Sequence, residues 1–581
     1  MKKILVLVFV CNSFLIFSQE QKKIDYGKIF GSFESNIAWY LNNKDKALEP
    51  PDFGRHPEDP LRSNTYLQVN YNYKNFTAGI QGESYSLALL SYNPKYKYTN
   101  VGTWFVNYKS NKLDITGGYF YDQFGSGLIF RAWEDRALGI NNSIRGGRVV
   151  YSPFDYLNFT GFYGKQRTGF EVANSDVFGF NTEFDLFNML KIDKMDLSIG
   201  LSYVGRDEVT TVEEPNFNNL TNAYSARFNF LYQSFYVSSE FIYKSDDAII
   251  MDEKIDNNFI KPGNAVLLNL GYSLKGLGIN VNLRRIENMT FYSQRAPILY
   301  TREEVPNGPL TSYGYSDMIM NYVPALTKQN HYTLANIYVY QAQPKVDFPD
   351  PNLQKAGETG GQVDLYYNFK KETFLGGKTG TTVAFNYCSW YNLGGEYIYY
   401  LPKSEEDPTL YSDYNTTFFG SSQKYYQEYN FEITKKVKDN LFTNFTYINQ
   451  YYNGKAIGGG KLVKTNIIAA DVTYLLNEKR SFKVQAEHMW ADADMHNWLS
   501  GGFEFFYNPR ISFYITDAYN YGNLIEADQT HYFNVGGTYT KGSIRVALNY
   551  GKQRGGLVCV GGICRYVPES VGVGLSLNYA F

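Results

Sequence analysis

The sequence predicts an all-β protein, a large single-chain antiparallel transmembrane β-barrel. The chain of 581 residues contains 54 Tyr, 42 Phe and 51 Gly, which is far more aromatic than an ordinary soluble protein. Its mean hydropathy is nevertheless only -0.37. Strands that turn apolar side chains toward lipid and polar side chains toward an aqueous interior average to this mild polarity.

Alternation is clearest in the last stretch, residues 571–581. One face of an extended strand carries Val573, Leu575, Leu577, Tyr579 and Phe581, and the other carries Gly572, Gly574, Ser576, Asn578 and Ala580. About ten residues is the length of a membrane-spanning strand. A final strand that ends in Phe581 resembles the assembly signal of Gram-negative outer-membrane β-barrels. That resemblance implies the cell outer membrane as location and the barrel assembly machinery as a partner during biogenesis.

The N-terminus has the pattern of a signal peptide. Lys2 and Lys3 precede an apolar run from Ile4 to Phe17, and the small Ser18 offers a cleavage point. The run is shorter than the roughly 20 residues that a spanning helix needs. We therefore predict a signal peptide over residues 1–18 and an outer-membrane β-barrel domain over residues 19–581.

Short turns alternate with longer polar segments along the mature chain. Lys74-Asn75 separates two alternating stretches, which predicts a tight hairpin. Further short turns are expected at residues 110–112, 153–155, 232–234, 477–479, 508–510 and 541–543. Residues 42–64 are expected to form a long extracellular loop. Short periplasmic turns and long extracellular loops are typical of bacterial barrels.

The strand count follows from parity, because both termini of such a barrel lie in the periplasm. An even number is reached when residues 315–322 form a strand and residues 324–329 form the following turn. The total is then about 26 strands, within a range of roughly 22 to 26. Residues 297–311 and 392–423 are interpreted as extracellular loops. A soluble β-propeller or β-solenoid is the rival fold, but the chain has no repeat of fixed period.

Charged residues that alternate with apolar neighbours should point into the lumen. They are Glu34, Glu83, Asp114, Glu183, Arg227, Glu240, Arg284, Lys483, Glu487 and Arg545. Both signs occur. Such a lining predicts either weak ion selectivity or salt-bridge networks that fill the barrel.

One charged stretch within residues 121–148 could fold inward. It combines Arg131, Glu134, Asp135, Arg136, Arg145 and Arg148 with glycines that permit sharp bends. In one interpretation these residues form a lumen constriction whose guanidinium groups bind anionic or sugar-like solutes. In the other they belong to an outer loop with surface ion pairs of little energetic value.

Cys559 and Cys564 lie close together in the last predicted outer loop. An exported protein meets oxidising conditions, and Gly561 and Gly562 permit a tight loop, so a disulfide is expected. Two thiols without nearby His or further Cys are a weak metal motif, and Cys388 stands alone. We predict no metal site and no cofactor.

The sequence gives no strong sign of an enzyme. The best candidate cluster, Glu487, His488, Asp492, Asp494 and His496, resembles the acid/base sets of outer-membrane proteases or a divalent-metal site. No nucleophile motif accompanies it, and His488 is expected on the lipid side. We interpret these as solvated rim residues and predict no catalytic residue.

Three separated segments, residues 124–146, 321–335 and 556–568, resemble signatures of an uncharacterised porin-like family of outer-membrane barrels from the Bacteroidota. The resemblance implies a location and an architecture, but no substrate and no functional residue. A formal net charge of -2 gives no indication of a nucleic-acid partner.

We expect a porin-like channel or solute transporter that contacts outer-membrane lipids. The alternative is a non-conducting barrel that serves as subunit or scaffold of an outer-membrane protein secretion, assembly or surface-lipoprotein complex, with protein or lipoprotein partners. A plugged lumen would favour this alternative.

Overall fold

The fold comes from a computed structural model. It describes residues 26–41, 60–90, 92, 96–192, 194–210, 212, 217–251, 254–256, 259–296, 298–300, 312–314, 318–348, 350–402, 404, 410–458, 460–560 and 562–581. The predicted signal peptide and most of the predicted loops 42–64 and 297–311 lie outside the described residues.

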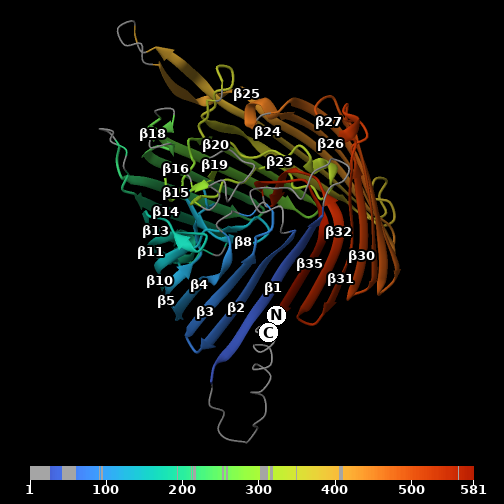
Figure 1. Ribbon diagram of the computed structural model, residues 1–581, viewed down its shortest axis with the longest axis horizontal. Coiled ribbons are helices and arrows are strands. Elements are labelled where there is room, and N and C mark those ends of the chain that lie inside the picture. The colour runs from blue at the N-terminus through green and yellow to red at the C-terminus, as the bar shows by residue number, and fades with distance from the viewer. Residues whose placement is uncertain are drawn as a thin grey trace, which may run out of the picture.

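In the described part of the chain, 24 antiparallel strands form a closed barrel (Figure 1). They are β1 (Lys28–Leu41), β2 (Leu61–Tyr73), β3 (Phe76–Ser86), β4 (Tyr98–Lys109), β5 (Leu113–Phe120), β10 (Ile144–Phe154), β11 (Leu157–Thr168), β13 (Asp176–Asp185), β14 (Met195–Asp207), β15 (Leu220–Tyr232), β16 (Phe235–Asp247), β19 (Lys261–Leu274), β20 (Leu277–Glu287), β23 (Gly357–Phe369), β24 (Thr381–Pro402), β25 (Leu410–Lys438), β26 (Leu441–Asn453), β27 (Leu462–Asn477), β28 (Arg480–Ala491), β29 (Trp498–Asn508), β30 (Ile511–Tyr519), β31 (His531–Lys541), β32 (Ile544–Gln553) and β35 (Ser570–Ala580). The predicted all-β barrel is confirmed, and its strand count lies inside the expected range.

Short elements occupy the connections. They are β6 (Asp122–Phe124), β7 (Phe130–Ala132), β8 (Glu134–Asp135), β9 (Ile140–Asn141), β12 (Glu171–Val172), α2 (Leu186–Leu190), β17 (Ile250–Met251), β18 (Lys254–Ile255), β21 (Ile298–Tyr300), β22 (Ser312–Gly314), η3 (Leu334–Asn336), α3 (Gly454–Ile457), η4 (Glu526–Asp528), β33 (Gly556–Val560) and β34 (Ile563–Val567). β12 pairs with β11 outside the ring of 24 strands. Among the described residues, no helix is long and apolar enough to cross a membrane.

The first and last strands close the barrel. β1 pairs with β35 from Ser32↔Ala580 to Leu41↔Val571. The backbone N–H of Gly31 donates to the carbonyl of Phe581 at 2.9 Å, and the N–H of Phe581 donates back at 3.0 Å. The terminal residue of the sequence signal is therefore part of the closing seam. Both described ends of the chain lie at the same end of the barrel, as an even strand number requires (Figure 1).

The turn predictions hold at that end. β2 and β3 are separated by Lys74 and Asn75, β15 and β16 by Gln233 and Ser234, and β31 and β32 by Gly542 and Ser543. Gly542 has φ of 59°, a conformation that glycine adopts without strain. The turn expected at residues 153–155 is shifted, because β10 runs to Phe154 and the turn is Asp155–Tyr156.

Side chains alternate between an apolar outer face and a polar or buried inner face. On β15, Tyr224 and Phe228 are 49% and 41% exposed, whereas the inward Ala223 and Arg227 are 0% and 7% exposed. Exposed aromatic and aliphatic residues recur around the wall, for example Trp104, Leu201, Phe385, Phe503 and Leu548. This continuous apolar outer face fits a barrel that spans a membrane.

The predicted loop 392–423 is wrong over residues 392–402 and 410–423, which are strand. β24 is 22 residues long and β25 is 29, and their pairing continues through Gly395↔Thr416 and Glu396↔Asn415. The two strands project beyond the rim as a long hairpin (Figure 1). Register shifts between Trp390 and Gly395 and between Ile398 and Leu401 interrupt the regular alternation, which explains why the sequence pattern did not show the strands.

The predicted barrel strand at residues 315–322 is also wrong over residues 318–322, whereas residues 315–317 lie outside the described part of the chain. Met318 and Met320 are fully buried, and their carbonyl and N–H, respectively, bond to Ser293 and Phe291 rather than to a barrel neighbour. Residues 324–329 continue across the lumen instead of turning into a strand. Alternating apolar residues can face a dry protein interior as readily as lipid, so the pattern alone did not distinguish the two environments.

Candidate functional site

Two chain segments enter the barrel from the loop end and fill that half of the lumen. The first insert, residues 121–143, connects β5 to β10. The second insert comprises the described residues within 288–356, which connect β20 to β23. β8 of the first insert is visible inside the ring of strands (Figure 1).

The first insert packs on an apolar row of the barrel wall. Successive strands from β10 to β20 contribute one buried inward residue each to this wall: Ile144, Phe162, Val177, Val204, Ala223, Ile242, Ala265 and Ile286. Phe124, Ile129 and Phe130 of the insert bury themselves in the same cluster. The rings of Phe130 and Phe162 stack with centroids 4.6 Å apart. The first insert is thus held mainly by apolar burial.

The second insert continues this core and bonds directly to the first. The Arg131 N–H donates to the Met320 carbonyl at 2.7 Å, and the Tyr322 N–H donates to the Gly127 carbonyl at 2.8 Å. Asn321 donates through Nδ2 to the Leu128 carbonyl at 3.1 Å. Backbone bonding of this kind makes the two inserts one plug.

The opposite wall holds the plug through a second apolar cluster, in which Leu334 and Ile337 of the second insert are buried, and through polar side chains. Glu487 on β28 accepts hydrogen bonds from the backbone N–H groups of Thr333 at 3.0 Å and Leu334 at 2.8 Å. Lys328 pairs with Glu432 on β25 at 2.7 Å. Trp390 on β24 donates through Nε1 to the Leu326 carbonyl at 3.2 Å. The second insert therefore crosses the lumen from one wall to the other.

Three predicted constriction residues of the first insert form a network on its side of the plug. Arg136 pairs with Glu34 on β1 at 2.7 Å and with Glu134 at 3.2 Å. Glu134 also accepts from Gln81 on β3 at 3.1 Å. The Arg131 guanidinium lies 4.0 Å from the centroid of the Tyr322 ring. These contacts tie the first insert to β1, β3 and the second insert.

The remaining predicted residues have other roles. Asp135 accepts from the Leu138 N–H at 2.9 Å within the insert. Arg148 faces inward on β10, where it pairs with Asp122 and lies 3.8 Å from Asp114. Arg145 is exposed on the outer face of β10, on the side of Val149 and Tyr151, and is not part of the lumen group. Strand alternation explains this separation of Arg145 from Arg148.

The charges predicted to line the lumen pair with one another at the level of the plug. Arg227 pairs with Glu183 at 2.5 Å, and its Nη1 lies 3.7 Å from Glu240. Glu240 also accepts from the Ser126 N–H of the first insert at 3.0 Å. Arg284 pairs with Glu358 at 2.5 Å. Of the two expected consequences of a mixed lining, the structure has the internal salt-bridge network.

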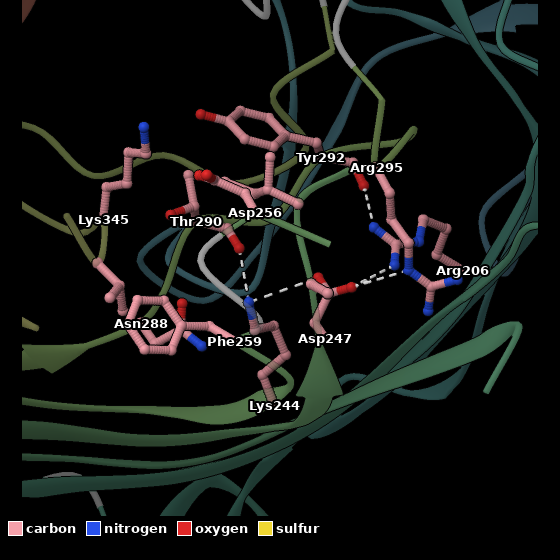
Figure 2. A pocket seen from close by; sticks show the side chains of 13 residues that line it. Arg206, Lys244, Asp247, Asp256, Phe259, Asn288, Thr290, Tyr292, Arg295 and Lys345 are labelled. Atoms are coloured by element: carbon pink, nitrogen blue, oxygen red, sulfur yellow. Dashed lines mark hydrogen bonds and ion pairs between the residues drawn. The ribbon is translucent and has the colours of Figure 1, made fainter. Parts of the chain in front are cut away.

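A second charged group fixes the start of the second insert at the wall (Figure 2). Asp247 on β16 pairs with Arg206 at 2.6 Å and with Arg295 of the insert at 3.1 Å. Lys244 donates to the Thr290 carbonyl at 2.6 Å and lies 3.5 Å from Asp247. Burial lowers the pKa of Arg295, because the charged guanidinium loses water there and lies near Arg206. Three cations thus surround one carboxylate, with Glu208 close to Arg206.

A disulfide joins Cys559 and Cys564 across the β33–β34 hairpin. The hairpin lies against the plug, since the Gly562 carbonyl accepts from the Ala325 N–H at 3.0 Å. On the other side, Arg565 lies over the Tyr92 ring at 5.2 Å. Cys388 is a buried free thiol on β24.

The residues of the candidate acid/base cluster are not brought together. Glu487 faces the plug, whereas His488 lies on the opposite face of β28 beside Trp490 and Tyr521. Asp494 accepts from the Tyr338 hydroxyl at 3.1 Å. In the part of the chain that the structure describes, no group of three or more His, Cys, Asp or Glu is placed to hold a metal ion.

The half of the lumen nearer the chain termini is lined differently. Inward residues such as Asn269, Asn280, Asn282, Gln362 and Asp364 are polar and only partly buried. Tyr236, also inward, is 37% exposed and donates to Asn280 at 2.6 Å. The barrel is therefore filled at the loop end and lined by solvated polar groups toward the other end.

Sequence reasoning missed the second insert altogether. Pro324 and Pro344 interrupt its pattern, and the stretch between them is rich in amides and tyrosines rather than alternating residues. Such a long connection without strand signals is itself unusual in a compact domain and could have indicated an insert.

Comparison with known proteins places the whole chain, residues 1–581, in the match of one family model, described as "Family of unknown function (DUF6029)". No curated protein matches the chain. Among solved structures, the translocation pore of the P pilus usher PapC covers 95% of this chain and 99% of its own, with 8% identity and a TM-score of 0.40.

Two further solved structures come from Pseudomonas aeruginosa. A mutant of the ferric enterobactin receptor PfeA covers 96% of this chain and 81% of its own, with 9% identity and a TM-score of 0.42. OccK3 covers 95% of each chain, with 9% identity and a TM-score of 0.34. These similarities are too low to assign a function.

Proposed function

Because the chain belongs to the family of unknown function DUF6029, we propose its function from the geometry of its own lumen. We propose that it is an outer-membrane solute transporter, a porin-like barrel that is closed at rest by its two inserts. Solute passage requires the plug to move or rearrange.

The outer face supports the membrane part of this proposal. Large apolar side chains are exposed around the barrel, and a closed ring of strands leaves no unpaired backbone edge for lipid to meet. The terminal Phe581 at the seam fits a barrel inserted by the barrel assembly machinery. The proposed location is the cell outer membrane, with its lipids as the surrounding partner.

The single observation that carries the transport proposal is the contrast between the two halves of the lumen. A barrel of 24 strands is wide enough for an aqueous interior. Its terminal half keeps solvated polar side chains, whereas its loop half is filled by the plug. A permanently sealed barrel does not need a solvated polar lining in the terminal half of its lumen.

The plug's anchors are suited to a reversible gate on one side. Besides apolar packing, the second insert is held on β24, β25 and β28 by hydrogen bonds and ion pairs, each worth about 0.5–3 kcal/mol. A ligand or protein partner that binds the displaced plug better would shift the equilibrium toward an open lumen.

A second function is favoured by the projecting β24–β25 hairpin together with the filled lumen. The hairpin places paired strands beyond the rim, where a partner protein can reach them. In this alternative the chain is a non-conducting subunit or scaffold that binds an outer-membrane protein or lipoprotein. We propose no catalytic role for either function.

Two experiments test the two proposed functions. One is single-channel recording of the purified protein in a planar bilayer, and the other is a pull-down from gently solubilised outer membranes. Transport predicts rare openings that become frequent when Glu487 or Phe130 is replaced. Complete silence of the wild type and of both variants, with a stoichiometric partner in the pull-down, would reject the transporter and favour the scaffold.

A further inference from the structure

A cavity of about 330 Å³ lies between the plug and the β33–β34 hairpin. The second insert provides most of its lining, and Gly562, Ile563 and Cys564 provide the hairpin side. Its volume is within the range of about 300–1,000 Å³ that small-molecule sites occupy. Ile457 of α3 also lines it, so the cavity belongs to the loop end of the barrel.

The polar groups of the cavity have a consistent character. Lys345 and Lys355 are its charged lining residues, and no Asp or Glu is among the described residues that line it. Gln341, Gln343 and Asn321 add amide groups, and Gln341 is exposed, so the cavity communicates with solvent. Asn321 Nδ2 already donates to the Leu128 and Met289 carbonyls, and Gln343 is bonded to Lys355 and to the Gln341 carbonyl. The Gln341 side chain can both donate to and accept from a ligand hydroxyl group, and the other two amide oxygens can accept.

The two lysines are not equally compensated. Lys355 is 9% exposed, donates to Gln343 Oε1 at 2.9 Å and lies 3.5 Å from Asp347. Burial lowers the pKa of Lys355, so a nearby anion would stabilise its charged form. Lys345 makes no ion pair within 4.0 Å of a described carboxylate, and Asp256, which lines the adjoining cavity with it, is close enough to interact with it electrostatically. A smaller cavity adjoins this one, and the ammonium group of Lys345 lies on the Tyr292 side of it (Figure 2).

This neighbouring cavity of about 30 Å³ continues the lysine-lined one toward the wall. Thr290, Tyr292 and Lys345 line both. Its far side holds Lys244, Arg206 and Arg295 around Asp247 (Figure 2). Among the described residues, the buried Nε of Arg206 and Nη1 of Arg295 have no hydrogen-bond partner, although Arg206 Nε lies 3.7 Å from Glu208. Cationic side chains therefore occur in both cavities, and in the smaller one they are partly compensated by Asp247 and Asp256.

We propose that the larger cavity binds a small hydroxylated anion, a sugar acid or sugar phosphate, whose charge meets Lys345 and Lys355 and whose hydroxyl groups meet the amides. This deepens the proposed function by naming the solute class, and it rests on that function for the step from binding to transport. The plug is then the element that binds the solute. A solute that binds the displaced plug more tightly than the docked plug shifts the equilibrium toward release of the plug.

Isothermal titration calorimetry on the full-length protein in detergent tests the site. The probes are D-glucuronate, glucose 6-phosphate, D-glucose and inorganic phosphate. Both sugar anions should bind, and D-glucose should bind at least tenfold more weakly. Phosphate binding as tight as that of glucose 6-phosphate, or equal binding of D-glucose, would overturn the assigned class.

Lysine variants locate the binding. Lys345→Gln should weaken binding of both sugar anions about tenfold or more, since it removes a charge-assisted contact. Lys355→Gln should do the same, while Lys461→Gln removes an exposed lysine of the neighbouring loop and should leave binding unchanged. Because Lys355 is buried, Lys345→Gln decides the outcome if Lys355→Gln does not fold. Unaltered binding by Lys345→Gln would refute the site.

Uptake of glucose 6-phosphate into proteoliposomes separates this inference from the proposed function. Tight binding without uptake would reject transport and leave the site intact. Uptake of the sugar phosphate without measurable binding, insensitive to Lys345→Gln, would reject the site and leave transport intact.

Discussion

The two walls that hold the plug combine apolar burial and polar contacts in different proportions. From β10 to β20 the barrel offers a row of buried aliphatic and aromatic residues, against which Phe124, Ile129 and Phe130 pack. From β24 to β29 it combines a second apolar cluster, in which Leu334 and Ile337 of the second insert are buried, with carboxylates and an indole N–H that bind the same insert. Apolar burial has no preferred direction and is lost only by exposure to water, whereas each polar contact can be exchanged for water at small net cost. We therefore call the β10–β20 wall the fixed side, and the β24–β29 wall, where polar contacts carry a larger share of the hold, the releasable side.

The largest effect is expected from truncation on the fixed side. Phe130→Ala removes a fully buried ring that stacks on Phe162, which should destabilise insert docking by about 3–5 kcal/mol. Planar-bilayer recording should then show sustained conductance, and protease should cleave within residues 121–143 of the embedded protein. The matched control is Phe228→Ala, which removes a lipid-facing Phe and should keep the channel closed. Equal conductance of both variants would refute the assignment of the β10–β20 wall as the fixed side.

Much of the barrel was predictable because alternation reports which face is apolar. The seam at Phe581 and the turn at Lys74-Asn75 followed from that pattern and from turn chemistry. The plug was not predictable in this way. Met318 and Met320 alternate like strand residues, yet they contact the inside of the barrel, where the environment is as dry as lipid.

The candidate residues show the same limit. Composition singled out the arginines of residues 121–148, but only position on a strand separates the outward Arg145 from the inward Arg148. Arg295 meets Asp247, and Glu487 meets Leu334, across distant parts of the chain, and no local motif marks these residues or the lysines of the cavity. Their arrangement depends on the path of the second insert across the lumen.

An intermediate effect is expected on the releasable side. Glu487→Gln weakens the acceptor for the Thr333 and Leu334 N–H groups, a change worth about 1–3 kcal/mol. Openings should become about tenfold or more frequent but remain brief, since the first insert stays docked. Glu504→Gln, an inward carboxylate on β29 away from the plug, is the control and should behave as wild type. Openings of Glu487→Gln as long as those of Phe130→Ala would mean that the two walls do not differ.

A smaller effect should separate two arginines on one strand. Arg148→Ala breaks the pairs with Asp122 and Asp114 inside the lumen, which should raise the frequency of openings a few-fold. Arg145→Ala removes an exposed charge on the outer face of the same strand and should change neither gating nor ion selectivity. If Arg145→Ala alters gating as strongly as Arg148→Ala, the inward and outward assignment of β10 fails.

The smallest effect on gating is expected from the hairpin disulfide. The closed loop between Cys559 and Cys564 is short, so the bond constrains the hairpin far more than the barrel. Thiol titration of the unfolded mature chain should find one thiol, Cys388, without reductant and three after reduction. Cys559→Ser with Cys564→Ser should preserve heat-modifiable migration and leave basal conductance unchanged. The pair should nevertheless weaken binding of glucose 6-phosphate, because Cys564 and Gly562 line the lysine-bearing cavity. Loss of the folded barrel in this double variant would show that the hairpin disulfide stabilises the barrel wall and not only the cavity. The expectation that the bond constrains the hairpin far more than the barrel would then be wrong.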